Sequence, residues 1–187
     1  MDYYESIRKQ FEYYKLLGER TFEQLADEHL FIQPAPESNS IAVIVKHLSG
    51  NMRSRWTDFL STDGEKEWRK RDEEFLPDLQ TRAEVMHAWQ IGWHCLFSAF
   101  NELKESDRDA IVYIRNLGHT VTEAINRQLA HYAYHVGQIV YIGKMLAAEN
   151  WQSLTIPKGK SETYNAQKFA RAKRRSHFTD DFIKNQS

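Results

Sequence analysis

The composition of this 187-residue chain is typical of a single globular domain with a hydrophobic core, since 41% of its residues are hydrophobic and 13% are aromatic. The formal net charge of −1 excludes the strongly basic surface of a typical nucleic-acid-binding protein. The single cysteine, Cys95, excludes an internal disulfide and any metal site built from several cysteines.

Two further features of the sequence bear on secretion and membrane insertion. Residues 1–14 are acidic and aromatic, unlike a secretory signal peptide. The longest uncharged run, residues 128–143, is too short and too polar to span a bilayer. We therefore expect a cytoplasmic protein that binds neither membranes nor nucleic acids.

The first predicted helix spans residues 2–25, where apolar side chains recur on one face of a helical repeat. Pro34 and Pro36 interrupt regular structure after it, because neither proline suits the interior of a helix. A second helix is predicted to begin after Ser40, a good N-cap, and to continue to about residue 59.

The second helix carries a polar row along the edge of its apolar stripe, formed by His47, Asn51 and Arg55 at a spacing of four residues. In helical bundles, metal and ligand sites are built from side chains on facing helices, and such a row is well placed to contribute. The alternative is that His47 is a boundary residue half exposed to solvent.

The segment from residue 60 to residue 80 is charged and contains Gly64 and Pro77, so we interpret it as a long connection within one domain. Its basic run, residues 69–71, is flanked by acidic residues. That pattern favours a solvated surface over a nucleic-acid-binding patch.

A third helix is predicted to begin with a capping box formed by Thr81 and Glu84. Its aromatic residues share one face, which we expect to lie in the core. His87 and His94 lie on the opposite face and are expected at the surface or in a dimer interface. Cys95 belongs to no recognisable Cys–His group and is interpreted as a structural thiol.

Two segments differ in character from the long helices. Residues 109–118 alternate between apolar and polar positions, which predicts a short strand leading into the fourth helix. Residues 150–187 are predicted to form a C-terminal extension that packs on the domain or trails from it as a solvated tail, with a short helix over 161–175.

The fourth predicted helix spans residues 120–148 and begins with a capping box of Thr120 and Glu123. Beside its broad apolar sector lies a narrower stripe that contains His131 and His135. Residues four apart lie about 6 Å from each other along a helix axis, so both imidazoles can reach one metal ion. The alternative is a pair of core histidines satisfied by hydrogen bonds.

His47, His131 and His135 together define a predicted three-histidine metal site. Three neutral imidazoles suit Zn, Ni, Fe or Mn as divalent ions and leave a coordination position open. Asn51, Arg55 and Gln138 lie near these ligand positions and are candidates for supporting the ligands or contacting a substrate. The sequence singles out no catalytic side chain.

Three segments resemble the DinB/YfiT-like superfamily of candidate metalloenzymes: SIAVIVKHLSGNM, TVTEAINRQLAHYAYHVGQIVYIGK and WQSLTIPKGKSETYN. The resemblance covers nearly the whole chain, residues 1–187, as a single domain. It implies an all-α fold, a four-helix bundle with long crossover connections, and often a homodimer. It also implies a divalent metal held by His47, His131 and His135.

Some members of this superfamily are thiol S-transferases that use a low-molecular-weight thiol such as bacillithiol or mycothiol, and others are metal-dependent hydrolases. The leading hypothesis is a thiol S-transferase, because a metal-bound thiol is deprotonated and needs no protein nucleophile. The alternatives are a hydrolase of amide or ester bonds, a non-enzymatic, stress-related bundle that binds a metal or small molecule, and a purely structural bundle.

Overall fold

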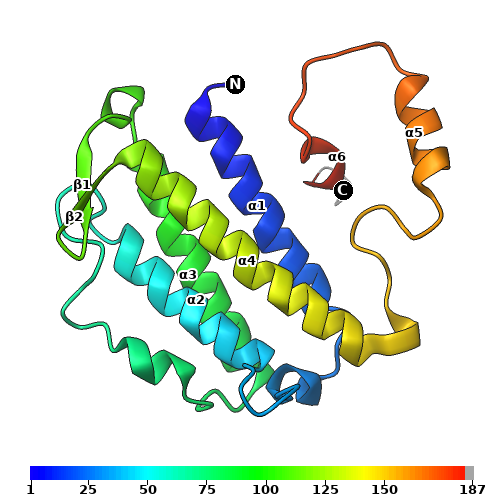
Figure 1. Cartoon of the computed structure of the whole chain (residues 1–187), viewed down its shortest axis with the longest axis horizontal. Coiled ribbons are helices and arrows are strands. Elements are labelled where there is room, and N and C mark those ends of the chain that lie inside the picture. Colours follow the sequence, from blue (N-terminus) through cyan, green and yellow to red (C-terminus); the bar gives the residue numbers. More distant parts are fainter. Residues whose placement is uncertain (184–187) are drawn as a thin grey trace.

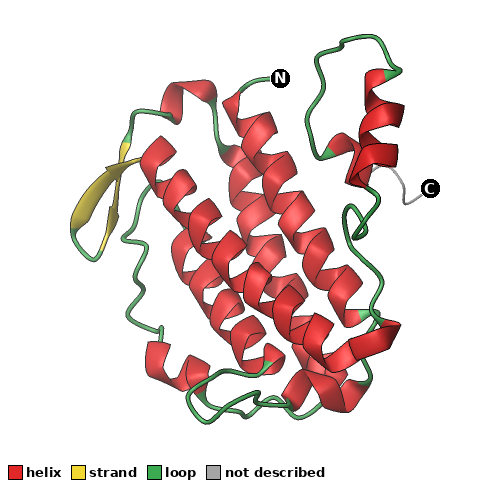
Figure 2. Ribbon diagram, turned by 45° about the vertical axis from the view of Figure 1, so that its right-hand side comes forward, coloured by secondary structure: helices red, strands yellow, loops and turns green. Residues whose placement is uncertain are grey.

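The computed structural model describes residues 1–183, and this part of the chain is mainly helical (Figure 1). The four long helices are α1 Tyr3–Phe22, α2 Ile41–Trp56, α3 Arg82–Glu102 and α4 Val121–Ala147. Both α1 and α2 pack against α3 and α4, so the long helices lie side by side around a shared core (Figure 2). The all-α prediction therefore holds in its general form.

Shorter elements connect and follow the long helices. The 3₁₀ helices are η1 Asp27–Phe31, η2 Arg71–Phe75, η3 Glu105–Asp107 and η4 Ala148–Asn150, and two short α-helices are α5 Ser161–Phe169 and α6 Asp180–Ile183. Of these, η2 lies in the long connection between α2 and α3 and packs against α2.

The predicted helix starts are confirmed by their caps. The hydroxyl groups of Ser40, Thr81 and Thr120 each accept a hydrogen bond from a backbone N–H in the first turn, and the last two form complete capping boxes. The helix ends are less well predicted: α2 stops at Trp56, before a left-handed residue at Asp58 (φ 49°).

Aromatic side chains from all the long helices meet in the core. Phe11 of α1 is fully buried and contacts Trp56, Trp93, Phe100 and Tyr132, with ring centroids 5.5–6.4 Å apart. The Trp56 indole N–H donates to the Tyr132 hydroxyl at 2.9 Å. This buried hydrogen bond joins α2 to α4 beside the predicted site, since Tyr132 directly follows His131.

The segment predicted as one short strand, residues 109–118, contains β1, the turn and the start of the second strand of a β-hairpin, in which β1 Ile111–Ile114 pairs antiparallel with β2 Leu117–Thr120. Its turn residues Arg115 and Asn116 both have positive φ, 54° and 61°, as in a type I′ turn. Asp63 accepts both of their backbone N–H groups at 2.8 Å. The connection before α3 thereby fixes a turn that the sequence does not signal.

The described part of the C-terminal extension contains two short helices that differ in their packing. The helix predicted over 161–175 ends at Phe169, and α5 has no buried residue. In contrast, α6 packs on α1, where the rings of Phe178 and Phe182 lie 6.0 and 5.4 Å from that of Tyr13. His177 and Thr179 are buried beside this contact.

Within residues 1–183, no helix combines the length and the apolar character needed to cross a membrane.

Candidate metal centre

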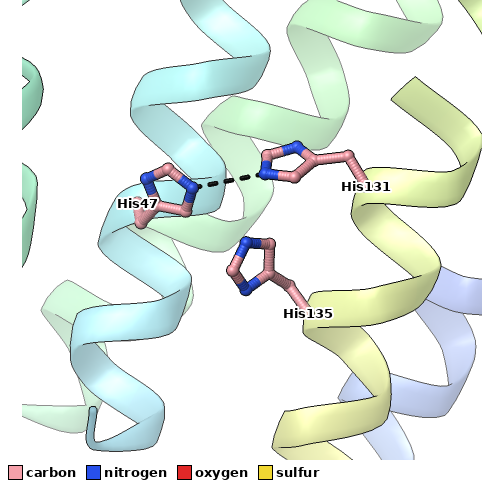
Figure 3. Close-up of side chains that lie close together, drawn as sticks. All are labelled: His47, His131 and His135. Atoms are coloured by element: carbon pink, nitrogen blue, oxygen red, sulfur yellow. Dashed lines mark hydrogen bonds between the residues drawn. The ribbon is translucent and has the colours of Figure 1, made fainter. Parts of the chain in front are cut away.

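Three histidine side chains converge between α2 and α4 (Figure 3). His131 and His135 lie one turn apart on α4, with their ring centroids 4.7 Å apart and their planes almost perpendicular. The ring of His47 on α2 faces them, with its centroid 5.4 Å from that of His131 and 4.9 Å from that of His135. One nitrogen from each ring lies within 4.8 Å of the other two.

The spacing of the ring nitrogens suits a metal ion. The Nε2 atoms of His47 and His131 are 3.4 Å apart. Two ligands of a tetrahedral ion with bonds of about 2.0–2.1 Å are separated by about 3.3 Å. His47 is buried, with 4% of its surface exposed, which excludes the half-exposed boundary position considered from the sequence.

The electrostatic environment keeps the two α4 histidines neutral, which is the form that binds metals. Burial lowers the pKa of His131 to about 3, and His135 and His47 contribute to the shift. Burial and the neighbouring His47 also lower the pKa of His135, although a hydrogen bond to Gln138 opposes the shift. The donor set therefore fits a divalent ion that prefers imidazole.

A carboxylate behind His47 orients its ring. His47 Nδ1 donates to Glu74 Oε2 at 2.9 Å, which leaves Nε2 with its lone pair directed at the cluster. The ring of Phe75 stacks on His47 at a centroid distance of 4.8 Å. Both residues belong to η2, so the connection between α2 and α3 forms part of the site.

Glu74 is itself held in place by Arg69. The guanidinium donates through Nε to Oε1 at 2.7 Å and through Nη2 to Oε2 at 2.9 Å, a bidentate ion pair. Burial raises the pKa of Glu74, but the hydrogen bonds from His47 and Arg69 outweigh burial, and the pKa lies below its ordinary value. The Glu74 carboxylate also packs closely against α2 at Gly50, where a Cβ atom would overlap it.

The other residues predicted near the ligands are close to the cluster. Gln138 Oε1 accepts a hydrogen bond from His135 Nδ1 at 2.9 Å. Asn51 and Arg55 line the same cavity as the three histidines. Asn51 Oδ1 accepts the hydroxyl proton of Tyr132 at 3.1 Å, and Arg55 pairs with Glu65 at 3.2 Å. Their contribution to binding or catalysis stays a prediction.

Arg69 and Glu74 are the site residues that the sequence reasoning missed. The prediction that residues 69–71 form a solvated surface is wrong for Arg69, whose side chain is only 2% exposed. Charge pattern alone cannot show which member of a mixed run folds inward. No periodicity marks this irregular connection either, so the sequence offers no signal for the contact.

The two histidines and the cysteine of α3 do not belong to the cluster. His87 and His94 are exposed on α3, as expected, and Cys95 is a half-buried free thiol. Its sulfur lies 3.5 Å from the Thr57 hydroxyl. Among residues 1–183, His47, His131 and His135 are the group whose ligand atoms are close enough to share a metal ion.

Replacing Glu74 with glutamine is expected to weaken metal binding about 10- to 100-fold, the usual effect of losing the partner of a ligating histidine. Glutamine can still accept from His47, but the negative charge that favours a metal-bound imidazole is lost. A competition titration with a chromophoric chelator measures the affinity.

The matched control is Glu73→Gln, because Glu73 is the adjacent residue and its side chain is 58% exposed. Thermal unfolding of both variants separates a loss of metal affinity from a loss of fold. Equal metal affinity in the Glu74→Gln and Glu73→Gln proteins would show that Glu74 does not support the site.

The family model described as "Protein of unknown function (DUF1572)" matches residues 1–160, which include all four long helices and the three histidines but not α5 and α6. No curated protein and no solved structure matches the chain.

Proposed function

The chain belongs to the DUF1572 family of proteins of unknown function, and we propose that it is a metal-dependent thiol S-transferase of the DinB/YfiT type. Its cofactor would be a divalent ion, Zn, Ni, Fe or Mn, held by His47, His131 and His135. Its cosubstrate would be a low-molecular-weight thiol. The fold that goes with this proposal is a four-helix bundle with crossover connections, and the packing of α1 and α2 against α3 and α4 supports it.

The reaction we propose transfers the thiol to an electrophilic carbon. The sulfur forms a bond to that carbon, the leaving group departs with its bonding electron pair, and the thiol proton is released to solvent. A divalent ion in the site supplies the chemistry that makes this possible at neutral pH, since a coordinated thiol is deprotonated.

The residues of the chain have separate tasks in this proposal. His131 and His135 present neutral imidazoles, because burial lowers the pKa of both. Glu74 holds His47 in the tautomer that leaves Nε2 free, and Gln138 does the same for His135. Three protein ligands leave a coordination position open for a thiol.

The observation that carries the proposal is that the cavity beside the histidines is lined by no aspartate or glutamate among the described residues. A metal-dependent hydrolase benefits from a carboxylate that acts as a general base on water. Glu74 does not meet this need, since its carboxylate is paired with Arg69 and its pKa is lowered. A thiol that is already deprotonated requires no such base.

The test is to load the metal-free protein separately with Zn, Ni, Fe and Mn, and to assay conjugation of bacillithiol, mycothiol and glutathione to 1-chloro-2,4-dinitrobenzene. We expect metal-dependent conjugation with at least one thiol, and its loss in a His131→Ala variant.

A second arm offers ester and amide substrates without any thiol. Hydrolysis in this arm without conjugation in the first would replace the transferase proposal by the hydrolase alternative. Stoichiometric metal binding with turnover in neither arm would identify a non-enzymatic metal-binding protein.

A further inference from the structure

The cavity beside the three histidines is rich in arginine. It has a volume of about 270 Å³ and lies between α2, α4, the hairpin turn and η2. Its lining includes Arg55, Arg69, Arg71, Arg115 and Arg127. Such a density of guanidinium groups is unusual for a cavity that would bind only a cation, because like charges raise the cost of placing a metal ion nearby.

The neighbouring carboxylates neutralise only part of this charge. Glu65 Oε2 lies 3.2 Å from Arg55, 3.4 Å from Arg69 and 3.0 Å from Arg115, so three arginines share it. Glu74 is committed to Arg69 and to His47. Glu65 and Glu74 are thus shared among Arg55, Arg69 and Arg115, and neither carboxylate pairs with the other two lining arginines.

The remaining two arginines lie at the exposed rim of the cavity and have weak partners. Arg71, with its side chain 50% exposed, lies 3.8 Å from the solvent-exposed Asp72 and over the ring of Phe75. Arg127 is exposed, and its Nη1 lies 3.0 Å from Nε2 of His119, to which it donates. Both guanidinium groups retain donors for a ligand.

Two buried polar groups in the cavity lining lack hydrogen-bond partners. Arg55 is 6% exposed and its Nε has none, and Gln128 is 4% exposed and its Oε1 has none. Buried polar groups are nearly always paired, so these two point to a missing ligand. Rotating the Gln128 amide by half a turn exchanges its oxygen and nitrogen, which gives a donor at the same place.

We propose that this cavity binds the carboxylate or phosphate group of a small-molecule substrate. Arg71 and Arg127 receive the anion at the rim, and Arg55 and Gln128 complete its hydrogen bonds inside. The fork of a guanidinium group matches both kinds of anion. The proposal rests on the proposed function only in assigning the anion to a substrate of the metal centre, because binding of the anion itself needs no metal.

The size of the cavity limits the ligand. A volume of about 270 Å³ is at the lower end of the range for small-molecule sites, roughly 300–1,000 Å³. It accommodates an acidic group and a few further atoms, and the rest of the molecule would extend past the exposed rim. A small acid or phosphate ester fits this description better than a macromolecule.

The experiment measures binding of inorganic phosphate and of succinate to the metal-free full-length protein by isothermal titration calorimetry at low ionic strength, where screening is weak. Saturable binding of at least one anion is expected. The preference between phosphate and succinate tells which acidic group the cavity favours. Absence of saturable binding by both anions would overturn the proposal.

Rim variants test where the anion binds. Arg127→Gln and Arg71→Gln are each expected to lower the affinity about tenfold, the value of one charge-assisted hydrogen bond. Arg127→Lys keeps the positive charge and is expected to lose less. Arg175→Gln is the matched control, because Arg175 is an exposed arginine outside this cavity.

Two outcomes separate this proposal from the proposed function. Anion binding that weakens in the rim variants, combined with no thiol conjugation in any metal-loaded form, leaves the anion site standing and removes the transferase. Anion binding that occurs only in the Zn-loaded protein and is unchanged in the Arg71→Gln/Arg127→Gln protein places the anion on the metal, and contradicts the arginine site.

Discussion

Replacing His131 and His135 together with alanine is expected to abolish metal binding while leaving the fold intact. Structural zinc sites gain roughly 10–16 kcal/mol from their ligands, so losing two ligands of three lowers the affinity by a factor on the order of 10³ or more. Both side chains are only half-buried, and neither belongs to the aromatic core. Calorimetric titration with Zn²⁺ measures the loss.

The matched control for this variant is His87→Ala/His94→Ala. It also removes two imidazoles from a long helix, but these lie on the exposed face of α3. Its metal affinity should equal that of the unaltered protein. An unchanged affinity in the His131→Ala/His135→Ala protein would mean that metal binds elsewhere in the chain.

Replacing Arg69 with methionine is expected to lower the free energy of unfolding by about 3–5 kcal/mol, because removing one partner of a buried ion pair leaves the other charge uncompensated. Arg69 and Glu74 have side-chain exposures of 2% and 8%, so water does not replace the lost contact. We also expect weaker metal binding, since Glu74 is then free to move away from His47.

The loss of stability in this variant should depend on pH. In the unaltered protein the pKa of Glu74 is lowered, so its ion pair contributes stability at neutral pH and the contribution disappears as the carboxyl group is protonated in acid. Without Arg69, the guanidinium no longer opposes the effect of burial on that carboxyl group, so the pKa of Glu74 is higher than in the unaltered protein. The difference in unfolding free energy between the two proteins is therefore largest near neutral pH and shrinks toward acid.

Two comparisons make the Arg69 prediction specific. Arg53→Met removes an exposed arginine that lies over the ring of Trp68, and should cost well under about 1 kcal/mol, as surface substitutions generally do. Adding Glu74→Gln to Arg69→Met removes the uncompensated charge and should restore part of the stability. Urea unfolding measures all of these variants. Equal destabilisation by Arg53→Met and Arg69→Met would show that the buried Arg69–Glu74 ion pair contributes no specific stability.

The long connection between α2 and α3 does more than join two helices. Its residues Glu65, Arg69 and Glu74 form a continuous chain of ion pairs that ends on His47. Arg115 of the hairpin turn joins the same chain through Glu65. Buried ion pairs are weak evidence for stability, and we interpret this chain as a device that fixes the orientation of a ligand.

The sequence predicts the helices and the histidines because both depend on local regularity. A capping box such as Thr120 with Glu123, and an i, i+4 pair such as His131 with His135, are visible at fixed spacings. His47 follows from the same logic, since it lies on the edge of an apolar stripe. The helix end at Trp56 is not visible in the pattern, because α2 stops where the backbone of Thr57 becomes extended, and no repeat in the sequence marks that change.

The features that escape sequence reasoning depend on distant contacts. Glu74 reaches His47 only because an irregular connection folds back onto α2, and 27 residues separate them. The hairpin turn at Arg115 and Asn116 contains no glycine, and it depends on Asp63, which accepts its N–H groups. These contacts have no repeating pattern, so only the folded structure reveals them.

Whether the three histidines hold a metal ion can be measured by elemental analysis of the full-length protein purified without a histidine tag. We predict about one divalent ion per chain, retained after gel filtration and absent from the His131→Ala/His135→Ala protein. Folded protein that keeps less than about a tenth of an equivalent after incubation with each of Zn, Ni, Fe and Mn would contradict this prediction.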